Sequence, residues 1–367
     1  MVYKIITKVI VARIRPHLDS MISPYQAAFI LGRRGTDNTI IVQEIIHSMG
    51  RSKGGKGYMA IKIDLEKAYD KIEWGFIREM LIHFNFSNNI IDLIMSCVTL
   101  VSTSLLFNGG CQESFLPSRG IRQGDPLSPY LFILCMEYLG HLIEGKCADK
   151  LWYLVKASRS GSAFSHIFFA DDLVLFARAD TGNCHTINEV LQEFCRRFGQ
   201  KVSEAKSWVY FSPNVDLDLR ENLADILGFR STSNLGKYLG SGGQDFGFVL
   251  DRVKKKLVGW KANLLSMAGR KVLIQASPST IPTYAMQNVQ LSDKILKGIN
   301  RVNRNFLWGS IENSKKMHWV GWDKVTTPKD RGGLGLQSAK GRNAALLAKL
   351  NWRFTRRTMH LGSRCSS

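Results

Sequence analysis

The stretch that decides the fold runs Ile167-Phe168-Phe169-Ala170-Asp171-Asp172-Leu173-Val174-Leu175-Phe176. Two β-prone apolar runs flank a pair of adjacent carboxylates, which predicts an antiparallel hairpin with acids at its tip. Like charges repel and apolar surroundings solvate them poorly, so a cation is expected to meet them. Aspartates are also common in exposed turns, and the pair alone favours that simpler interpretation.

A third acid shifts this balance. Asp64 stands near the end of a mostly apolar run, Tyr58 to Leu65, which predicts a buried strand able to lie beside the hairpin. Three carboxylates would form a cradle for a divalent metal, and oxygen ligands suit Mg²⁺. A paired-metal site of this kind can activate a hydroxyl and stabilise a departing pyrophosphate in phosphoryl transfer.

Around these acids the chain alternates amphipathic helices with short strands. Asn108-Gly109 predicts a hairpin turn, because these residues accept the positive φ angles that such turns require. The alternation predicts an α+β, palm-like sheet with helices on one side. From Val249 onward the pattern is helical, and Gly240-Ser241-Gly242-Gly243 is a candidate joint before it.

The charge balance restricts the partners. Lys and Arg number 50 against 30 Asp and Glu in 367 residues, a net charge of +20 that favours a polyanionic partner such as nucleic acid, although a basic soluble protein of any function would fit equally. The seven cysteines are odd in number and widely spaced, which is typical of reduced intracellular thiols and supports no zinc site. No segment suggests a membrane span.

Three motifs carry a family resemblance. Residues 63–72 read Ile-Asp-Leu-Glu-Lys-Ala-Tyr-Asp-Lys-Ile, residues 120–129 read Gly-Ile-Arg-Gln-Gly-Asp-Pro-Leu-Ser-Pro, and residues 169–172 read Phe-Ala-Asp-Asp. In this order they resemble successive palm motifs of LINE and group II intron reverse transcriptases. Similarity to the downstream region of plant LINE-type (non-LTR) elements runs on to about Arg353.

The resemblance implies a right-hand polymerase fold with partial fingers, a palm with an antiparallel sheet and catalytic hairpin, and a helical thumb. The expected division is 1–57 for partial fingers, 58–240 for the palm with fingers elements, 241–310 for the thumb-like region and 311–354 for a Trp/Gly-rich region. Residues 355–367 match nothing in the family and are expected to be a disordered tail.

The resemblance also assigns the acids. Asp64, Asp171 and Asp172 would be the metal-binding catalytic triad for two Mg²⁺ ions, with Mn²⁺ able to substitute. Lys206 resembles a lysine that protonates the leaving pyrophosphate, which is a weaker assignment.

Other matches concern the incoming nucleotide. Tyr69 matches the aromatic residue that blocks a ribose 2′-hydroxyl, although a core tyrosine would also fit. Gln123 and Gly124 match a loop against the nucleotide and template base, where the alternative is a turn that leads into a helix. Arg33 matches a fingers arginine that contacts the triphosphate, and is otherwise a surface charge.

Two further matches concern nucleic acid. Tyr238-Leu239-Gly240 resembles the segment that grips the primer end, and is otherwise a plain strand end. Four cations fall on one helical face opposite an apolar stripe, where they would track phosphates or merely be solvated. They are Lys294, Lys297, Arg301 and Arg304.

The expected function is RNA-directed DNA polymerisation, in which deoxynucleoside triphosphates are added to a DNA primer on an RNA template. Family members carry an endonuclease and more of the fingers before this region, and often a Cys/His segment after it. The rivals are an inactive retroelement remnant that only binds nucleic acid and a maturase-like RNA-binding splicing cofactor. Nuclear localisation is expected from what such elements do, and the oligomeric state is open.

Overall fold

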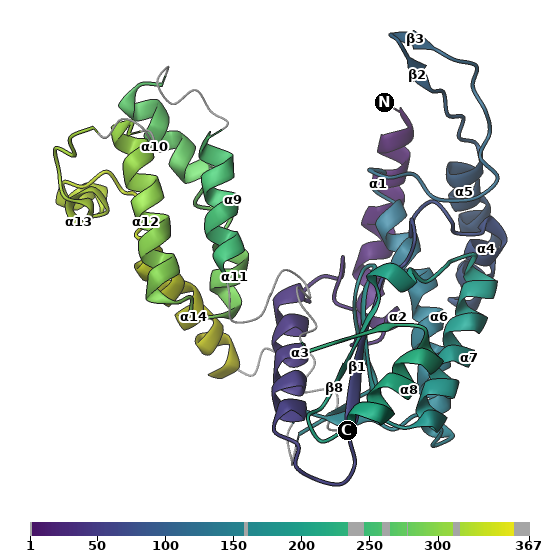
Figure 1. The fold of residues 1–367 in the computed structure, drawn as a ribbon. Helices are drawn as coiled ribbons and strands as arrows, with labels where there is room; N and C mark the ends of the chain where they lie inside the picture. Colours follow the sequence, from purple (N-terminus) through teal and green to yellow (C-terminus); the bar gives the residue numbers. More distant parts are fainter. Residues whose placement is uncertain are drawn as a thin grey trace. The chain divides into compact units, whose positions relative to one another are not determined.

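The structure is a computed structural model that describes residues 2–157, 161–233, 246–258, 265–276, 278–310 and 316–355. The chain divides into two compact units, residues 1–235 and 236–359, and each is described by itself (Figure 1). All the strands of the described residues lie in the first unit. The described elements of the second unit are helical.

The helices of the first unit are α1 (Val2–Ile14), α2 (Leu18–Met21), α3 (Gly35–Gly50), α4 (Trp74–His83), α5 (Asn88–Thr99), α6 (Ser128–Ala148), α7 (Thr181–Phe198) and α8 (Leu217–Leu227), with 3-10 turns at Arg15–His17 and Glu204–Lys206. Its strands are β1 (Tyr58–Ile63), β2 (Leu106–Phe107), β3 (Gly110–Cys111), β4 (Val155–Lys156), β5 (Ala163–Phe164), β6 (His166–Phe169), β7 (Asp172–Arg178), β8 (Trp208–Phe211) and β9 (Arg230–Thr232).

A five-stranded sheet in the order β6-β7-β1-β8-β9 forms the centre of this unit. β1 lies antiparallel to both β7 and β8, and β6 and β7 form the hairpin that the sequence predicts. β9 runs parallel to β8, so the sheet is mixed at this edge where an antiparallel sheet was expected. The parallel pairing is possible because α8 makes the crossover between the two strands.

The alternation of side chains along the strands gives the sheet two faces. Met59, Ile61 and Ile63 of β1 and Leu173 and Leu175 of β7 belong to one large buried core. Residues of α4, α5, α6 and α7 fill the rest of that core, and Figure 1 shows α4, α6 and α7 on one side of the sheet. The even-numbered positions of β1 and β7 face the other way.

Local signals explain where several elements begin and end. α7 starts after Asp180, whose side chain accepts the N–H of Asn183, and it ends at Gly199 with a φ of 77°. The β2–β3 turn has positive φ at both Asn108 and Gly109, as its sequence predicts. α6 begins at Ser128 and has Pro129 in its first turn, where proline is favoured.

The second unit consists of α9 (Gly247–Val258), α10 (Met267–Ala276), α11 (Thr283–Asn288), α12 (Asp293–Trp308), α13 (Trp322–Val325) and α14 (Ala339–Thr355), with a 3-10 turn at Lys329–Arg331. α12 contributes to both of its hydrophobic clusters: Ile295 and Ile299 pack in one, and Phe306 and Leu307 in the other. α12 also contacts α9, α10 and α14, so it is the central helix of this unit.

The predicted α+β class with a palm-like sheet is confirmed. The finer division into fingers, palm, thumb and downstream segments stays a prediction. The predicted joint at 240–243 and nearly all of the predicted tail lie outside the described residues. In the described part of the chain, no helix is both long and apolar enough to cross a membrane.

Candidate functional site

The sheet register brings two of the predicted acids together. Ile63 pairs with Leu173, so one further step of the antiparallel register sets Asp64 opposite Asp172. Both are even-numbered positions and share the face of the sheet that points away from the main core. Asp172 is the first residue of β7, and Asp64 follows the last residue of β1.

The third acid lies in the tight turn between β6 and β7. Phe169 pairs with Asp172, which leaves Ala170 and Asp171 as the two turn residues. Ala170 has a φ of 55°, a left-handed conformation that residues other than glycine rarely adopt. The turn sets Asp171, an exposed residue, directly beside the half-buried Asp172.

The charges at this end of the sheet influence one another. Burial raises the pKa of Asp172, the ammonium group of Lys62 lowers it, and the carboxylates of Asp171 and Asp64 raise it again. The three acids are therefore close enough to repel, although they come from two distant parts of the chain. Such mutual repulsion favours the binding of a cation.

Lys206 lies next to Asp64. Its Nζ is 3.8 Å from Oδ1 of Asp64, while 72% of its side chain remains exposed. The segment is fixed by its backbone, because the N–H of Ser203 donates to the carbonyl of Asp64 and the Oγ of Ser207 accepts the N–H of Asp64. An exposed ammonium group held beside the acids is suited to meet an anionic substrate.

The residues fit a divalent metal by their chemistry. The donors are three carboxylates, which are the hard oxygen ligands that Mg²⁺ prefers. Among the residues that the structure describes, however, no three Asp, Glu, His or Cys side chains converge on one point. The carboxylates thus share a face and a charge interaction, and the structure shows no coordination geometry.

Tyr69 lies beside these acids. Its ring stacks on Phe132 with centroids 5.0 Å apart and planes 5° apart. Burial, together with the nearby carboxylate of Asp171, raises the pKa of Tyr69 to about 12. Tyr69 is therefore a neutral phenol near the acids, and its ring is held against Phe132.

The loop that contains Gln123 and Gly124 is tied to Tyr69. The N–H of Ile121 donates to the carbonyl of Tyr69 at 2.8 Å, and the indole N–H of Trp74 donates to the carbonyl of Gly120 at 2.7 Å. At Gly120 a Cβ would lie 2.7 Å from the backbone oxygen of Asp70, so only glycine fits there.

Gln123 and Gly124 themselves are exposed, and Gly124 has a φ of 82°. The Nε2 of Gln123 donates to Oδ1 of Asp70 at 3.4 Å, which is a weak bond. The two residues therefore stand at the surface of the loop that is hydrogen-bonded to Tyr69 through Ile121.

Arg33 occupies a different place from the one that its sequence match predicts. Its side chain is only 4% exposed and forms an ion pair with Asp19 at 3.0 Å. The guanidinium also donates to the backbone carbonyls of Asp19, Ile22, Ser23 and Gln26. A group with this many internal partners is not exposed to a triphosphate, so in this structure Arg33 fixes the segment at 19–26, which comprises most of α2 and the loop after it.

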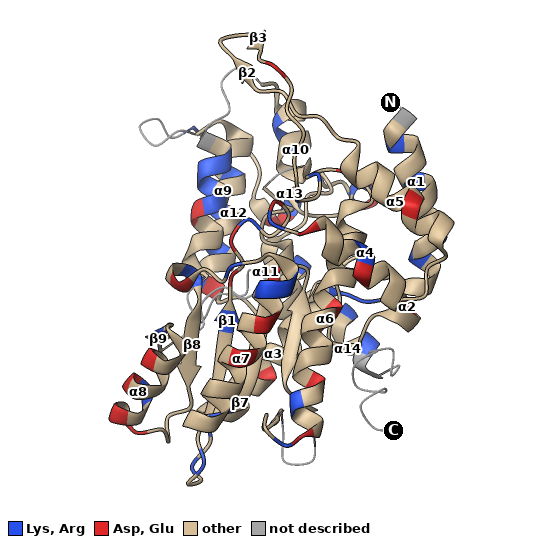
Figure 2. Cartoon of the chain, turned by 90° about the vertical axis from the view of Figure 1, so that its right-hand side faces the viewer, with Lys and Arg blue, Asp and Glu red and all other residues tan. Residues whose placement is uncertain are grey.

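Three of the four cations predicted on α12 are exposed. Lys294, Lys297 and Arg301 face solvent, while Arg304 is half-buried. α9 adds a second basic surface, visible in blue in Figure 2, and the guanidinium of Arg252 lies 5.6 Å from the ring of Phe248. Exposed cations on adjacent turns of a helix suit the regular spacing of phosphates.

The predicted primer-grip segment, Tyr238-Leu239-Gly240, lies outside the described residues. Its role therefore remains a prediction.

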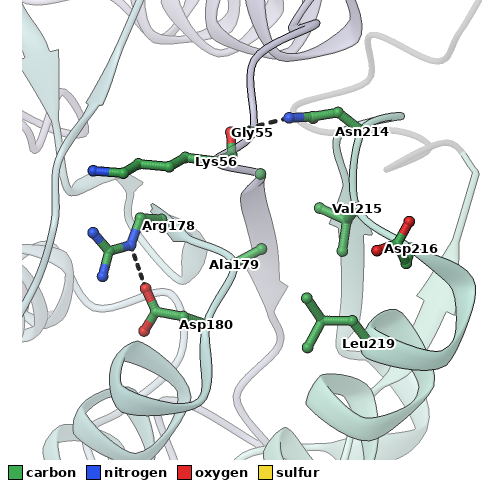
Figure 3. A pocket seen from close by; sticks show the side chains of 10 residues that line it. Gly55, Lys56, Arg178, Ala179, Asp180, Asn214, Val215, Asp216 and Leu219 are labelled. Atoms are coloured by element: carbon green, nitrogen blue, oxygen red, sulfur yellow. Dashed lines mark hydrogen bonds and ion pairs between the residues drawn. The ribbon is translucent and has the colours of Figure 1, made fainter.

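A pocket of about 240 Å³ lies elsewhere in the first unit (Figure 3). Arg178 and Asp180 form an ion pair on one side of it, and Val215 and Leu219 give it an apolar wall on the other. Gly57 and Arg178 stand at the start of β1 and the end of β7, whereas the acids stand at the opposite ends of these strands. The pocket is thus separate from the acidic site.

The sequence interpretation missed Lys62. It lies two residues before Asp64 and therefore on the same face of β1, and its charge lowers the pKa of Asp172. The signal was present in the sequence as a lysine within a strand of otherwise apolar residues.

Comparison with known proteins identifies the family of the chain. Residues 1–242 match the family described as reverse transcriptase (RNA-dependent DNA polymerase), and all three acids, Tyr69, Gln123 and Lys206 fall within the match. The chain belongs to the reverse transcriptase family. Reverse transcriptases generally use divalent metal ions.

Several relatives come from mobile elements. This chain is 26% identical over 340 residues to a retrovirus-related Pol polyprotein from a type-2 retrotransposable element of Drosophila melanogaster, covering 86% of this chain and 30% of that protein. It is 23% identical over 342 residues to an uncharacterized 149 kDa protein of transposon TX1 from Xenopus laevis. The match covers 91% of this chain and 25% of that protein. The predicted resemblance to non-LTR retrotransposon reverse transcriptases is confirmed.

A plant relative covers a shorter part. A putative ribonuclease H protein of Arabidopsis thaliana is 44% identical over 108 residues, which are 29% of this chain and 17% of that protein. The chain spans less than a third of the length of each of these three relatives. Among solved structures, apo telomerase from Candida tropicalis is similar at 12% identity with a TM-score of 0.42, covering 83% of this chain and 55% of that one.

Proposed function

We propose that this reverse transcriptase adds deoxynucleotides to the 3′-hydroxyl of a DNA primer on an RNA template. The observation that carries the proposal is the register that sets Asp64 opposite Asp172 and beside the Asp171 turn. Two Mg²⁺ ions, or Mn²⁺ in their place, would be held by these three carboxylates. Bound divalent ions would activate the primer hydroxyl and stabilise the departing pyrophosphate.

The other residues have supporting roles in this proposal. Lys206, exposed beside Asp64, would donate a proton to the pyrophosphate as it leaves. Tyr69 would lie against the sugar of the incoming nucleotide and leave no room for a 2′-hydroxyl. Gln123 and Gly124 would contact the nucleotide and the template base from the loop that Tyr69 anchors.

The exposed cations of α12 would bind the backbone of the template–primer duplex. This assignment rests on the exposure of Lys294, Lys297 and Arg301, with Arg304 contributing less because it is half-buried. Nuclear localisation is part of the same proposal, since integration of a mobile element takes place on chromosomal DNA.

The experiment is primer extension on a poly(rA)/oligo(dT) duplex with Mg²⁺, in which the wild-type chain is compared with Asp171→Ala. We expect extension to fall by roughly 100-fold or more in the variant and to stop when EDTA removes the metal. Asp225→Ala, which removes an exposed carboxylate on α8, is the matched control and should extend normally. A wild-type chain that binds the duplex and adds nothing would contradict the proposal and favour a remnant that only binds nucleic acid.

A further inference from the structure

The turn that carries Asp171 is strained and buried on one side. Ala170 is 8% exposed and has a φ of 55°. Because it is a turn residue between β6 and β7, its N–H has no partner in the strand ladder. A strained conformation persists only where the surrounding structure holds it, and a buried N–H needs an acceptor.

A glutamine from the N-terminal loop supplies that acceptor. Oε1 of Gln26 accepts the N–H of Ala170 at 3.0 Å and the N–H of Ala28 at 2.9 Å. The Gln26 side chain is almost fully buried, at 1% exposure. Its Nε2 has no hydrogen-bond partner among the described residues, so the oxygen alone accounts for the polar contacts of this side chain.

The loop that presents Gln26 is itself fixed to the hairpin. The N–H of Phe168 donates to the carbonyl of Tyr25 at 2.9 Å, and Nδ2 of Asn38 donates to the carbonyl of Phe168 at 2.7 Å. Arg33 donates to the carbonyl of Gln26 at 2.7 Å. These bonds fix the backbone around Gln26 independently of the turn. Its side chain can therefore restrain the turn.

We infer that Gln26 is a positioning residue for catalysis, which holds the Ala170–Asp171 turn, and with it the carboxylates of Asp171 and Asp172, in the arrangement that binds metal. This inference rests on the proposed function. Loss of the acceptor releases the turn toward a less strained conformation and moves both carboxylates. Because the nucleotide contacts at Tyr69 and Gln123 are on other segments, the effect falls on the rate of extension more than on the KM for deoxynucleotide.

The test uses Gln26→Met, which keeps the length of the side chain and removes only the acceptor and the unpartnered Nε2. Hydrogen exchange at the amide of Ala170, followed by NMR without metal or substrate, should be at least about tenfold faster than in wild type. Primer extension should fall by about 100-fold, the loss typical of an ångström-scale displacement of catalytic groups, with the KM for deoxynucleotide nearly unchanged.

Two further variants separate positioning from simple destabilisation. Gln26→Glu keeps an oxygen acceptor, so it should restore the slow exchange at Ala170 and extend faster than Gln26→Met. Asn183→Leu is the matched control, because Asn183 is also 1% exposed and its side-chain oxygen accepts a backbone N–H, that of Tyr153, near the far end of β7. It should lower the melting temperature and leave exchange at Ala170 unchanged.

The outcomes are distinct. Equal exchange at Ala170 in wild type and Gln26→Met would overturn the inference, and so would equal losses of extension in Gln26→Met and Asn183→Leu at matched stability. Faster exchange with a selective loss of extension would support it. A wild-type chain that does not extend a primer would defeat the proposed function, whereas the exchange result would still decide whether Gln26 holds the turn.

Discussion

At the scale of single residues, the site depends on side chains whose neighbours decide their chemistry. Asp172 differs from an exposed aspartate because burial and two further carboxylates raise its pKa. A carboxyl group with a raised pKa binds metal less well as the pH falls, so Mg²⁺-dependent extension should decline at a higher pH than an ordinary aspartate would require. The charge of Lys62 partly offsets this effect.

Tyr69 provides a prediction about sugar selection. Tyr69→Ala should raise the use of ribonucleotides relative to deoxynucleotides by roughly 10- to 100-fold, because it removes the ring that stacks on Phe132 and that, in the proposed function, would close off the 2′ position. The measurement is competitive incorporation of both substrates opposite one template base. Tyr69→Phe keeps the ring and should keep the selection, so equal discrimination in the two variants would contradict this role.

At the scale of elements, α6 fixes the loop that follows α2 through a buried acid. Oε1 of Glu137 accepts the N–H of Ser23 at 2.8 Å, and its carboxyl group is nearly inaccessible to solvent. Burial raises the pKa of Glu137 to about 7, although the bond from Ser23 and the charge of Arg33 oppose this change. The first unit should therefore be less stable when Glu137 is ionised.

The sign of this effect leads to a test with Glu137→Gln. The stability that protonated Glu137 provides is present below its unfolded pKa of 4.5 and is lost as the pH rises through about 7. Glutamine accepts the same bond without ionising, so the variant should exceed wild type by roughly 3 kcal/mol near pH 8.5 and by roughly 1 kcal/mol near pH 5. Denaturant unfolding at both pH values measures the difference in unfolding free energy between the variant and wild type. A difference that is the same at both pH values would contradict the raised pKa of Glu137.

At the scale of the whole molecule, the net charge of +20 is unevenly distributed along the chain. No Lys or Arg occurs between Arg78 and Arg119, and Figure 2 shows the β2–β3 hairpin without basic residues. Phe107 and Leu116 of this region are 67% and 74% exposed, so its surface is apolar. α9 and α12, by contrast, carry clusters of cations.

This distribution predicts which residues determine the salt dependence of duplex binding. The double variant Lys297→Gln, Arg301→Gln should weaken binding and reduce the slope of log K against log salt by about 2, since each lost phosphate contact changes the slope by about 1. Fluorescence anisotropy over a salt series measures the slope. The control is Arg78→Gln, which removes an exposed cation that is paired with Asp92 and should leave the slope unchanged.

The sequence by itself determined the elements and their chemistry. The apolar runs around Asp171-Asp172 predict the β6–β7 hairpin, and Asn108-Gly109 predicts the β2–β3 turn. The apolar run that ends near Asp64 predicts a strand with an acid at its end. These signals are local, because strand and turn preferences depend on near neighbours along the chain. Three motifs in order were also enough to indicate the family.

Only the tertiary structure decided which groups meet. The register of β1 against β7 sets Asp64 opposite Asp172, the fold buries Arg33 that the motif suggested for a triphosphate, and it brings Gln26 to the N–H of Ala170 across 144 residues of chain. Burial and long-range pairing depend on how distant segments pack, and no local pattern encodes them. The acids could therefore be identified from the sequence, whereas the residues that position them could not.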